Sequence, residues 1–194
     1  MDALKHRLNG DVVTVIFKFF IDGNDYDPFT LNDIKSLSKK ITKWNRCAQW
    51  ASKKGNLEIL KYINSLKLSI DWVKCIFYAS LFGHTESTRF ILFTVLKGHI
   101  EMVDYYQCLF NAIEGGNLET IKVIEPEEKE IDKYTWSDCM CHAIVHNHLE
   151  IVKYFGERIV NFGIQYAERS CCMNEAEEGG DPHIIEYVEN MFDW

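Results

Sequence analysis

Apolar and polar residues recur along most of this chain with the period of an α-helix, and one pattern appears five times. Each copy starts with Cys, has Ala four residues later, and has Gly or Asn four residues after that. Beyond the Gly or Asn, apolar residues stand at offsets of two, four, five, seven and eight, which form one stripe of a helix. The copies begin at Cys47, Cys75, Cys108, Cys139 and Cys172. Each copy is therefore predicted to be a helix, a tight reversal and a second helix.

Two further columns of the repeat have a physical explanation. A methyl group one turn before the reversal lets two helices approach closely, where a larger side chain would overpack the contact. This column holds Ala51, Ala79, Ala112, Ala143 and Ala176. The reversal favours a positive φ angle, which Gly and Asn tolerate best. The turn column holds Gly55, Gly83, Gly116, Asn147 and Gly180, at spacings of 28, 33, 31 and 33 residues. Because one hairpin cannot bury its own apolar stripe, we expect an all-α array of stacked hairpins.

These residues resemble ankyrin repeats. The stretches "GNLEILKYI", "GNLETIKVI" and "NHLEIVKYF" are similar to the second helix of that family, and the spacing is near its usual period of about 33 residues. The Thr-Pro-Leu-His box of the family is absent, and Cys stands in place of its Pro. The resemblance covers residues 44–194 and implies an ankyrin-like helical-hairpin solenoid of about five units, which would bind proteins.

One segment does not follow this register. The stretch "KGHIEMVDYY", residues 97–106, has its own turn glycine and a complete second-helix stripe. Gly98 comes only 15 residues after Gly83 and 18 before Gly116, which is too short on either side for a full hairpin. We therefore predict one irregular unit near residues 84–106, with a lengthened or irregular helix.

Residues 1–43 precede the repeats and read as two short helices joined by a Gly/Asp/Pro loop, with Thr30 or Asn32 as the cap of the second helix. They resemble the F-box, a helical module that binds the Skp1 subunit of cullin-RING ubiquitin ligases, although Asn9 replaces the usual Pro. The resemblance makes six apolar residues the candidate Skp1 contacts: Leu8, Val12, Val13, Ile16, Phe17 and Phe20. The alternative is a helical cap over the apolar end of the first repeat. The sequence leaves both interpretations open.

An F-box-like segment joined to divergent ankyrin-like repeats resembles proteins of large DNA viruses, namely poxviruses, giant viruses and the asfarvirus multigene families. The resemblance implies an adaptor that presents a host target to a Skp1-cullin ubiquitin ligase in the host cytoplasm. The alternative is a protein that binds a host factor or modulates immunity and has no link to a ligase. Both interpretations predict protein partners, no cofactor and no enzymatic activity.

Composition and charge narrow the range of partners. The chain is 47% hydrophobic, and its longest apolar runs are too short to cross a bilayer. Its net charge is -8; residues 1–45 carry 7 Lys and Arg against 6 Asp and Glu, and residues 46–194 carry 14 against 23. Phosphate contacts need clustered basic residues, so nucleic acid is not an expected partner of the repeats. No secretory signal is recognised, and the seven cysteines are expected to remain thiols in a reducing compartment.

The stretch "DCMCHAIVHNHLEI", residues 138–151, is the densest concentration of reactive side chains. The repeat accounts for Cys139 and for His148, which stands in the Gly-His or Gly-Asn position of the family. His142 and His146 are four residues apart on one helix face, but they lack the further ligands that zinc takes in tetrahedral sites. A nucleophilic Cys141 would need His142 and a third group to orient it. Neither a metal site nor a catalytic site is predicted.

Three features of the surface bear on binding. The acidic runs at residues 125–132 and 175–181 are read as solvated loops or as part of a binding rim for a basic partner. The final helix has no evident polar cap. We therefore expect Ile185, Val188 and Met191 to be exposed for a partner.

Overall fold

The computed structural model describes residues 30–97, 101–125, 133–161, 169–179 and 181–192. These residues form helices and no strand, which confirms the predicted all-α class for the described part of the chain. No helix among them is long and apolar enough to span a membrane. The six candidate Skp1 contacts between Leu8 and Phe20, and the turn residue Gly180, lie outside the described residues.

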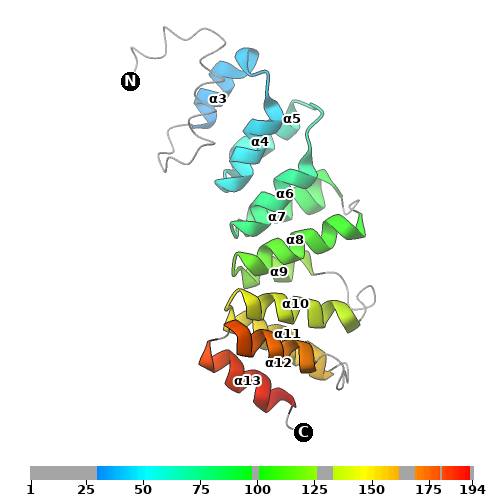
Figure 1. The fold of residues 1–194 in the computed structure, drawn as a ribbon. Coiled ribbons are helices and arrows are strands. Elements are labelled where there is room, and N and C mark those ends of the chain that lie inside the picture. Colours follow the sequence, from blue (N-terminus) through cyan, green and yellow to red (C-terminus); the bar gives the residue numbers. More distant parts are fainter. Residues whose placement is uncertain (1–29, 98–100, 126–132, 162–168, 180, 193–194) are drawn as a thin grey trace.

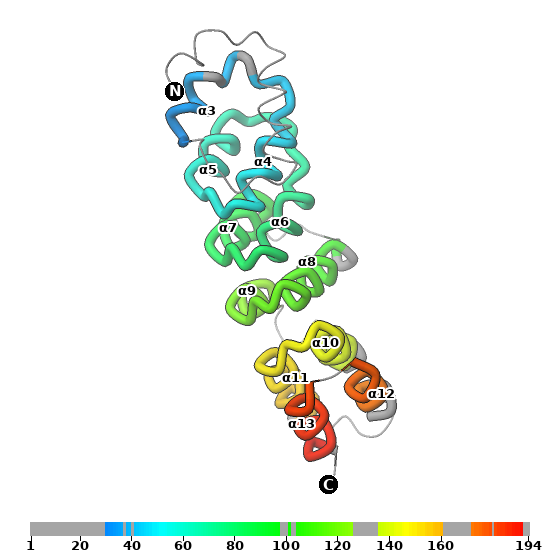
Figure 2. Tube along the Cα trace, turned by 60° about the vertical axis from the view of Figure 1, so that its left-hand side comes forward, coloured from blue at the N-terminus to red at the C-terminus, as the bar shows by residue number. Residues whose placement is uncertain are grey.

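The helices form hairpins that stack along an elongated molecule in two rows (Figures 1 and 2). The first row contains α4 (Trp44–Lys53), α6 (Trp72–Leu81), α8 (Met102–Glu114), α10 (Lys133–Val145) and α12 (Arg169–Gly179). The second row contains α3 (Leu31–Leu37), α5 (Leu57–Ser65), α7 (Thr85–Arg89), α9 (Leu118–Ile124), α11 (Leu149–Asn161) and α13 (Pro182–Phe192). Every helix of the first row contacts the next one in that row. Each hairpin thus buries the apolar face of its neighbour.

The cysteine and alanine columns lie in the core between the rows. All five column cysteines are at most 1% exposed, and all five column alanines are 0% exposed. Free cysteine packs as a small hydrophobe, and the alanine methyl group leaves room for the neighbouring helix. Both columns are therefore positions of close packing.

The turns explain the Gly or Asn that follows. The φ angles are 66° at Gly55, 69° at Gly83, 71° at Gly116 and 58° at Asn147, as the sequence predicts. At each turn the next residue donates its backbone N–H to the carbonyl of the column alanine, over 2.8 to 3.0 Å. The turn residue itself donates to the carbonyl three residues before it. This pair of bonds is a Schellman motif, which ends a helix and satisfies its last carbonyls.

The side chain after the turn residue also reaches back to the preceding hairpin. It donates to a carbonyl at the end of the previous first helix, two residues before that hairpin's own turn residue. These bonds run from His84 Nε2 to Lys53 O (2.9 Å), from Asn117 Nδ2 to Leu81 O (3.1 Å) and from His148 Nε2 to Glu114 O (3.0 Å). We call them the inter-turn hydrogen bonds; they join successive hairpins at their ends.

The last joint reverses the direction of this bond. Asp181 stands after the turn, and an ionised carboxylate has no hydrogen to donate. Instead Asn147 donates from Nδ2 to Gly179 O over 3.4 Å and accepts from the backbone N–H of Asp181 over 3.1 Å. Asn147 thus serves as the turn residue of one hairpin and as the connection to the next.

We expect Gly116→Ala to lower the free energy of unfolding by about 1–3 kcal/mol. An alanine there would have to keep the positive φ of Gly116, and its methyl group would lie 2.8 Å from Cε1 of His148. His148→Ala removes the ring, so the two changes together should cost less than the sum of the single changes. Urea denaturation of the four proteins of this double-mutant cycle measures the coupling.

The control for this cycle is Gly179→Ala. Gly179 ends α12, and a methyl group there meets no atom within 4 Å, so the change should stay within about 0.5 kcal/mol. Strictly additive costs at Gly116 and His148 would contradict the close approach of the two turns.

An irregular helix lies within residues 84–106, but the residues from Met102 onward belong to a different helix of the repeat than the sequence pattern indicates. Helix α7 has five residues and continues into the π-helical segment η2 (Phe90–Val95), in which Leu96 N donates to Ile91 O over 2.9 Å. The apparent second-helix stripe after Gly98 does not form a second helix. Its residues from Met102 onward begin the first helix α8, which has 13 residues.

Helix α3 joins the second row. Thr30 caps it in a capping box with Asp33, one of the two caps predicted from the sequence. The short 3-10 turn η1 (Ser38–Lys40) follows. Ile34 is 0% exposed and Ile41 is 6% exposed, and α3 packs against α5. The described part of residues 1–43 therefore covers one end of the first hairpin.

The prediction of an open apolar face on the final helix is wrong for Val188. Val188 is 0% exposed, and Ile185 and Met191 are partly buried against the core. A methyl group at Gly156 of α11 would lie 2.9 Å from the sulfur of Met191. The apolar stripe of α13 therefore packs against the preceding hairpin. The exposed positions among the described side chains of α13 are Pro182 and four polar residues, His183, Glu186, Glu189 and Asn190.

Candidate functional site

The first helices share one outward face, opposite the core. On a helix, the residue before the column cysteine and the sixth residue after it lie on the side away from that cysteine and the column alanine. We call the described residues of these two columns the first-helix face: Arg46, Lys74, Gln107 and Asp138, with Lys53, Leu81, Glu114, Val145 and Glu178. Leu81 is half-buried and the other eight are exposed.

The charge on the first-helix face changes sign along the array. Helix α4 contributes Arg46 and Lys53 and contains no acidic residue, and α6 contributes Lys74, which forms an ion pair with Asp71 over 3.1 Å. Further along, α10 contributes Asp138, and α12 contributes Glu178. Since the first helices stack in chain order, this sequence of charges is also an order in space (Figure 1). One end of the face is basic and the other is acidic.

Two exposed aromatic side chains lie at the basic end. Tyr78 on α6 is 39% exposed, and Phe82, which follows α6, is 44% exposed. Nζ of Lys53 lies 5.1 Å from the centre of the Phe82 ring, a cation–π contact between two hairpins. Exposed aromatic side chains are enriched at the centre of protein interfaces.

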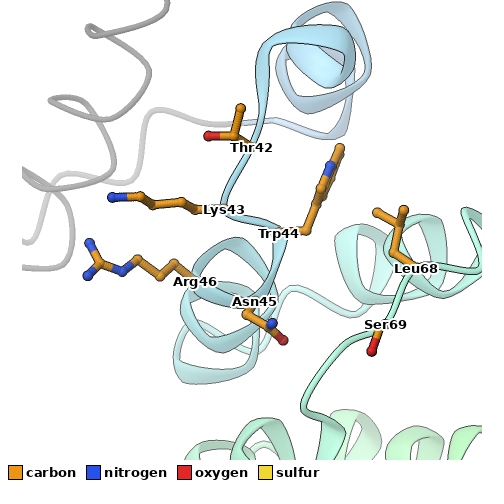
Figure 3. A pocket seen from close by; sticks show the side chains of 7 residues that line it. All are labelled: Thr42, Lys43, Trp44, Asn45, Arg46, Leu68 and Ser69. Carbon is orange, nitrogen blue, oxygen red and sulfur yellow. The ribbon is translucent and has the colours of Figure 1, made fainter.

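A cavity of about 450 Å³ lies at the start of α4. It is lined by Thr42, Lys43, Trp44, Asn45, Arg46, Leu68 and Ser69. Figure 3 shows that Lys43 and Arg46 extend to the same side, away from Leu68 and Ser69, so the cationic groups do not converge on its apolar part. Such an open recess extends the basic end of the face and lacks the convergent polar groups of a small-molecule site.

The cysteine and histidine side chains of residues 138–151 contact different neighbouring helices. Cys139 is fully buried, whereas the Cys141 sulfur contacts Cys172 on α12. The His142 ring lies 5.1 Å from Phe110 on α8 and 4.7 Å from His146. Burial, and secondarily the nearby His146, lowers the pKa of His142, so its ring is neutral at neutral pH. Cys141 and His142 therefore point towards opposite neighbouring hairpins.

The first residue of the acidic run at residues 125–132 is part of a structural ion pair. Glu125 accepts from Arg158 Nε at 2.5 Å and from Arg158 Nη2 at 2.8 Å, and it also accepts from the Tyr154 hydroxyl. Burial, followed by the bond to Glu125, raises the pKa of Tyr154. The Arg158 guanidinium also lies 5.6 Å from the ring of Trp136. Glu125 is thus neither solvated nor available to a partner.

Among the described residues, no three His, Cys, Asp or Glu side chains are placed so that they could hold a metal ion. Comparisons with protein-family models, with curated proteins and with solved structures found no match. The exposed charged residues of the first-helix face, together with Tyr78 and Phe82 beside it, make this face the candidate functional site in the described part of the chain.

The repeat pattern of the sequence does not single out Tyr78 and Phe82, which lie beside the first-helix face. Phe82 precedes its turn glycine, and the corresponding residues in the other copies are Lys54, Gly115, His146 and Gly179. An aromatic residue in a column that is otherwise polar or glycine was the signal that could have identified it.

Proposed function

We propose that this chain is a divergent ankyrin-like repeat solenoid that binds another protein through the first-helix face. The observation that carries the proposal is the pair of exposed aromatic side chains, Tyr78 and Phe82, beside the basic residues of that face. The stacked hairpins with Schellman turns support the ankyrin-like assignment. The proposed activity is recognition, without chemical change in the partner.

The charge gradient specifies the partner's chemistry. A partner that lies along the array would carry an acidic segment over α4 and α6 and a basic segment over α12, where Glu177 and Glu178 are exposed. Such a match fixes the direction in which the partner binds. The inter-turn hydrogen bonds hold the hairpins in place before binding, which reduces the entropy lost on association.

We expect the double variant Tyr78→Ala with Phe82→Ala to reduce capture of the partner at least about tenfold, because buried aromatic anchors dominate interface energies. The measurement is quantitative mass spectrometry of proteins that the full-length chain captures from lysate, at low and at high salt. Capture should weaken as salt rises, since the proposed contacts are charged.

The matched control is Phe93→Ala with Val160→Ala. These side chains are 54% and 58% exposed but belong to η2 and α11, which are not first helices and contribute no residue to the first-helix face. The control should capture the same proteins as the unchanged chain. Equal losses in both variants would contradict a site on the first-helix face.

The ligase-adaptor hypothesis rests on the sequence pattern of residues 8–20. In the described part of the F-box-like segment, the apolar Ile34 and Ile41 are buried and so are not open to Skp1. The candidate Skp1 contacts are the apolar residues between Leu8 and Phe20. Pull-down of purified Skp1 with the full chain, and with Ile16→Asp and Phe17→Asp, tests this: no binding by the full chain would count against the adaptor, and binding that survives the changes would count against these contacts.

A further inference from the structure

Cys141 and Cys172 bring two thiols together at the joint between the last two hairpins. Their Sγ atoms are 3.2 Å apart, although the residues are 31 positions apart in the chain. Cys141 belongs to α10 and Cys172 to α12, two first helices that pack against each other. We propose that this pair is a thiol oxidation site, at which a peroxide closes a disulfide between α10 and α12.

The repeat frame does not account for a sulfur at Cys141. Two residues after the column cysteine, the other copies have Gln49, Phe77, Phe110 and Asn174. The column therefore tolerates large, small, polar and aromatic side chains, and packing alone places no demand for cysteine there. Cys172, in contrast, is a column cysteine with a structural reason to be present. Because position 141 is a cysteine, Cys172 is the column cysteine that has this second thiol beside it.

The placement of the two sulfur atoms suits a disulfide. Sulfur atoms in a disulfide are about 2.05 Å apart, so the pair must close by about 1 Å. The helices that carry them are already neighbours. A small shift of α12 and a side-chain rotation are sufficient for such a movement, and no hairpin has to open.

Exposure determines which sulfur reacts first. Cys141 is partly exposed, whereas Cys172 and Cys139 are 0% exposed. The Cys141 thiolate attacks one oxygen of the peroxide and becomes a sulfenic acid as the O–O bond breaks, and the other oxygen leaves as hydroxide, which becomes water with the proton that the Cys141 thiol lost. The Cys172 sulfur then attacks the Cys141 sulfur and displaces hydroxide, which leaves as water with the Cys172 proton. The two thiols lose two electrons and two protons, and hydrogen peroxide becomes two molecules of water.

The disulfide would act on the hairpin of α12 and α13. Each hairpin of a stacked array is held only by its neighbours, so it can open locally. A covalent link between α10 and α12 restrains that opening. Oxidation is thus expected to stabilise the C-terminal end of the array, whether or not the first-helix face binds a protein.

The experiment uses the full-length chain, treated with a small excess of hydrogen peroxide and compared with the reduced chain. Peptide mapping without reduction should find a disulfide between Cys141 and Cys172. The apparent Tm should rise by roughly 5–10 °C and return to its initial value after addition of a reductant. Cys141→Ala, at a partly exposed position, should fold normally and should show neither the disulfide nor the rise.

Two further variants separate this pair from its sequence neighbours. Cys171→Ala should keep the disulfide, and Cys172→Ala should lose it. A disulfide that uses Cys139 or Cys171, an equal rise in Tm for Cys141→Ala, or the absence of any disulfide after peroxide treatment would each overturn the proposal.

Discussion

Replacing Phe155 by alanine is expected to lower the free energy of unfolding by about 3–5 kcal/mol. Phe155 on α11 is 0% exposed, and the centre of its ring lies 5.7 Å from that of Trp136 on α10. The two rings connect the helices of one hairpin, so the substitution removes both buried area and an aromatic contact. Few single changes in this chain should cost more.

The measurement is urea denaturation followed by circular dichroism at 222 nm, with the unfolding free energy taken from a linear extrapolation. Val160→Ala is the matched control, because Val160 lies on the same helix and is 58% exposed. Its expected effect is within about 0.5 kcal/mol. A loss below about 1 kcal/mol for Phe155→Ala would mean that α10 and α11 do not pack as described.

Mild alkali is expected to unfold the chain through its column cysteines. Burial raises the pKa of the Cys47, Cys75 and Cys108 thiols to about 12, and it also raises the pKa of Cys139. In the unfolded chain these thiols ionise near pH 8.5, while the folded chain keeps them protonated. The unfolded state therefore releases protons first, and stability falls as pH rises from about 9 towards 12.

Each such thiol contributes about 1.4 kcal/mol per pH unit to this fall, so the four together contribute up to about 5.6 kcal/mol per pH unit. Denaturation curves under reducing conditions at pH 8, 9 and 10 measure the slope. Cys47→Ala should make the slope shallower by about 1.4 kcal/mol per pH unit. Ile59→Val, which also truncates a fully buried side chain, should lower stability without changing the slope. Equal slopes for Cys47→Ala and the unchanged chain would contradict the prediction.

The repeat pattern of the sequence was sufficient to predict the hairpins. The spacing of apolar residues fixes which side of a helix is buried, and a positive φ at a turn favours Gly or Asn, although Lys67 and Lys97 also adopt one. Both are local properties, which explains why the buried cysteines and alanines and the turn at Asn147 agree with the structure. The helix cap at Thr30 was predicted for the same reason.

The sequence-based predictions were wrong or incomplete where a contact with the neighbouring hairpin determines the burial or the bonding of a residue. The burial of Val188 and the ion pair of Glu125 both depend on a partner from another hairpin. The same is true of the inter-turn bond from His148 to Glu114. Spacing along one helix carries no information about which residue of the next hairpin lies opposite.

The sequence by itself determined the helical hairpins, their buried columns and the turn residues, because these follow from the period of a helix and from φ angles. Only the tertiary structure decided what the stacked hairpins share: the charge gradient of the first-helix face, the exposed Tyr78 and Phe82, and the contact of Cys141 with Cys172. Stacking sets the order and the register of the helices, and that order turns separate columns of residues into one surface.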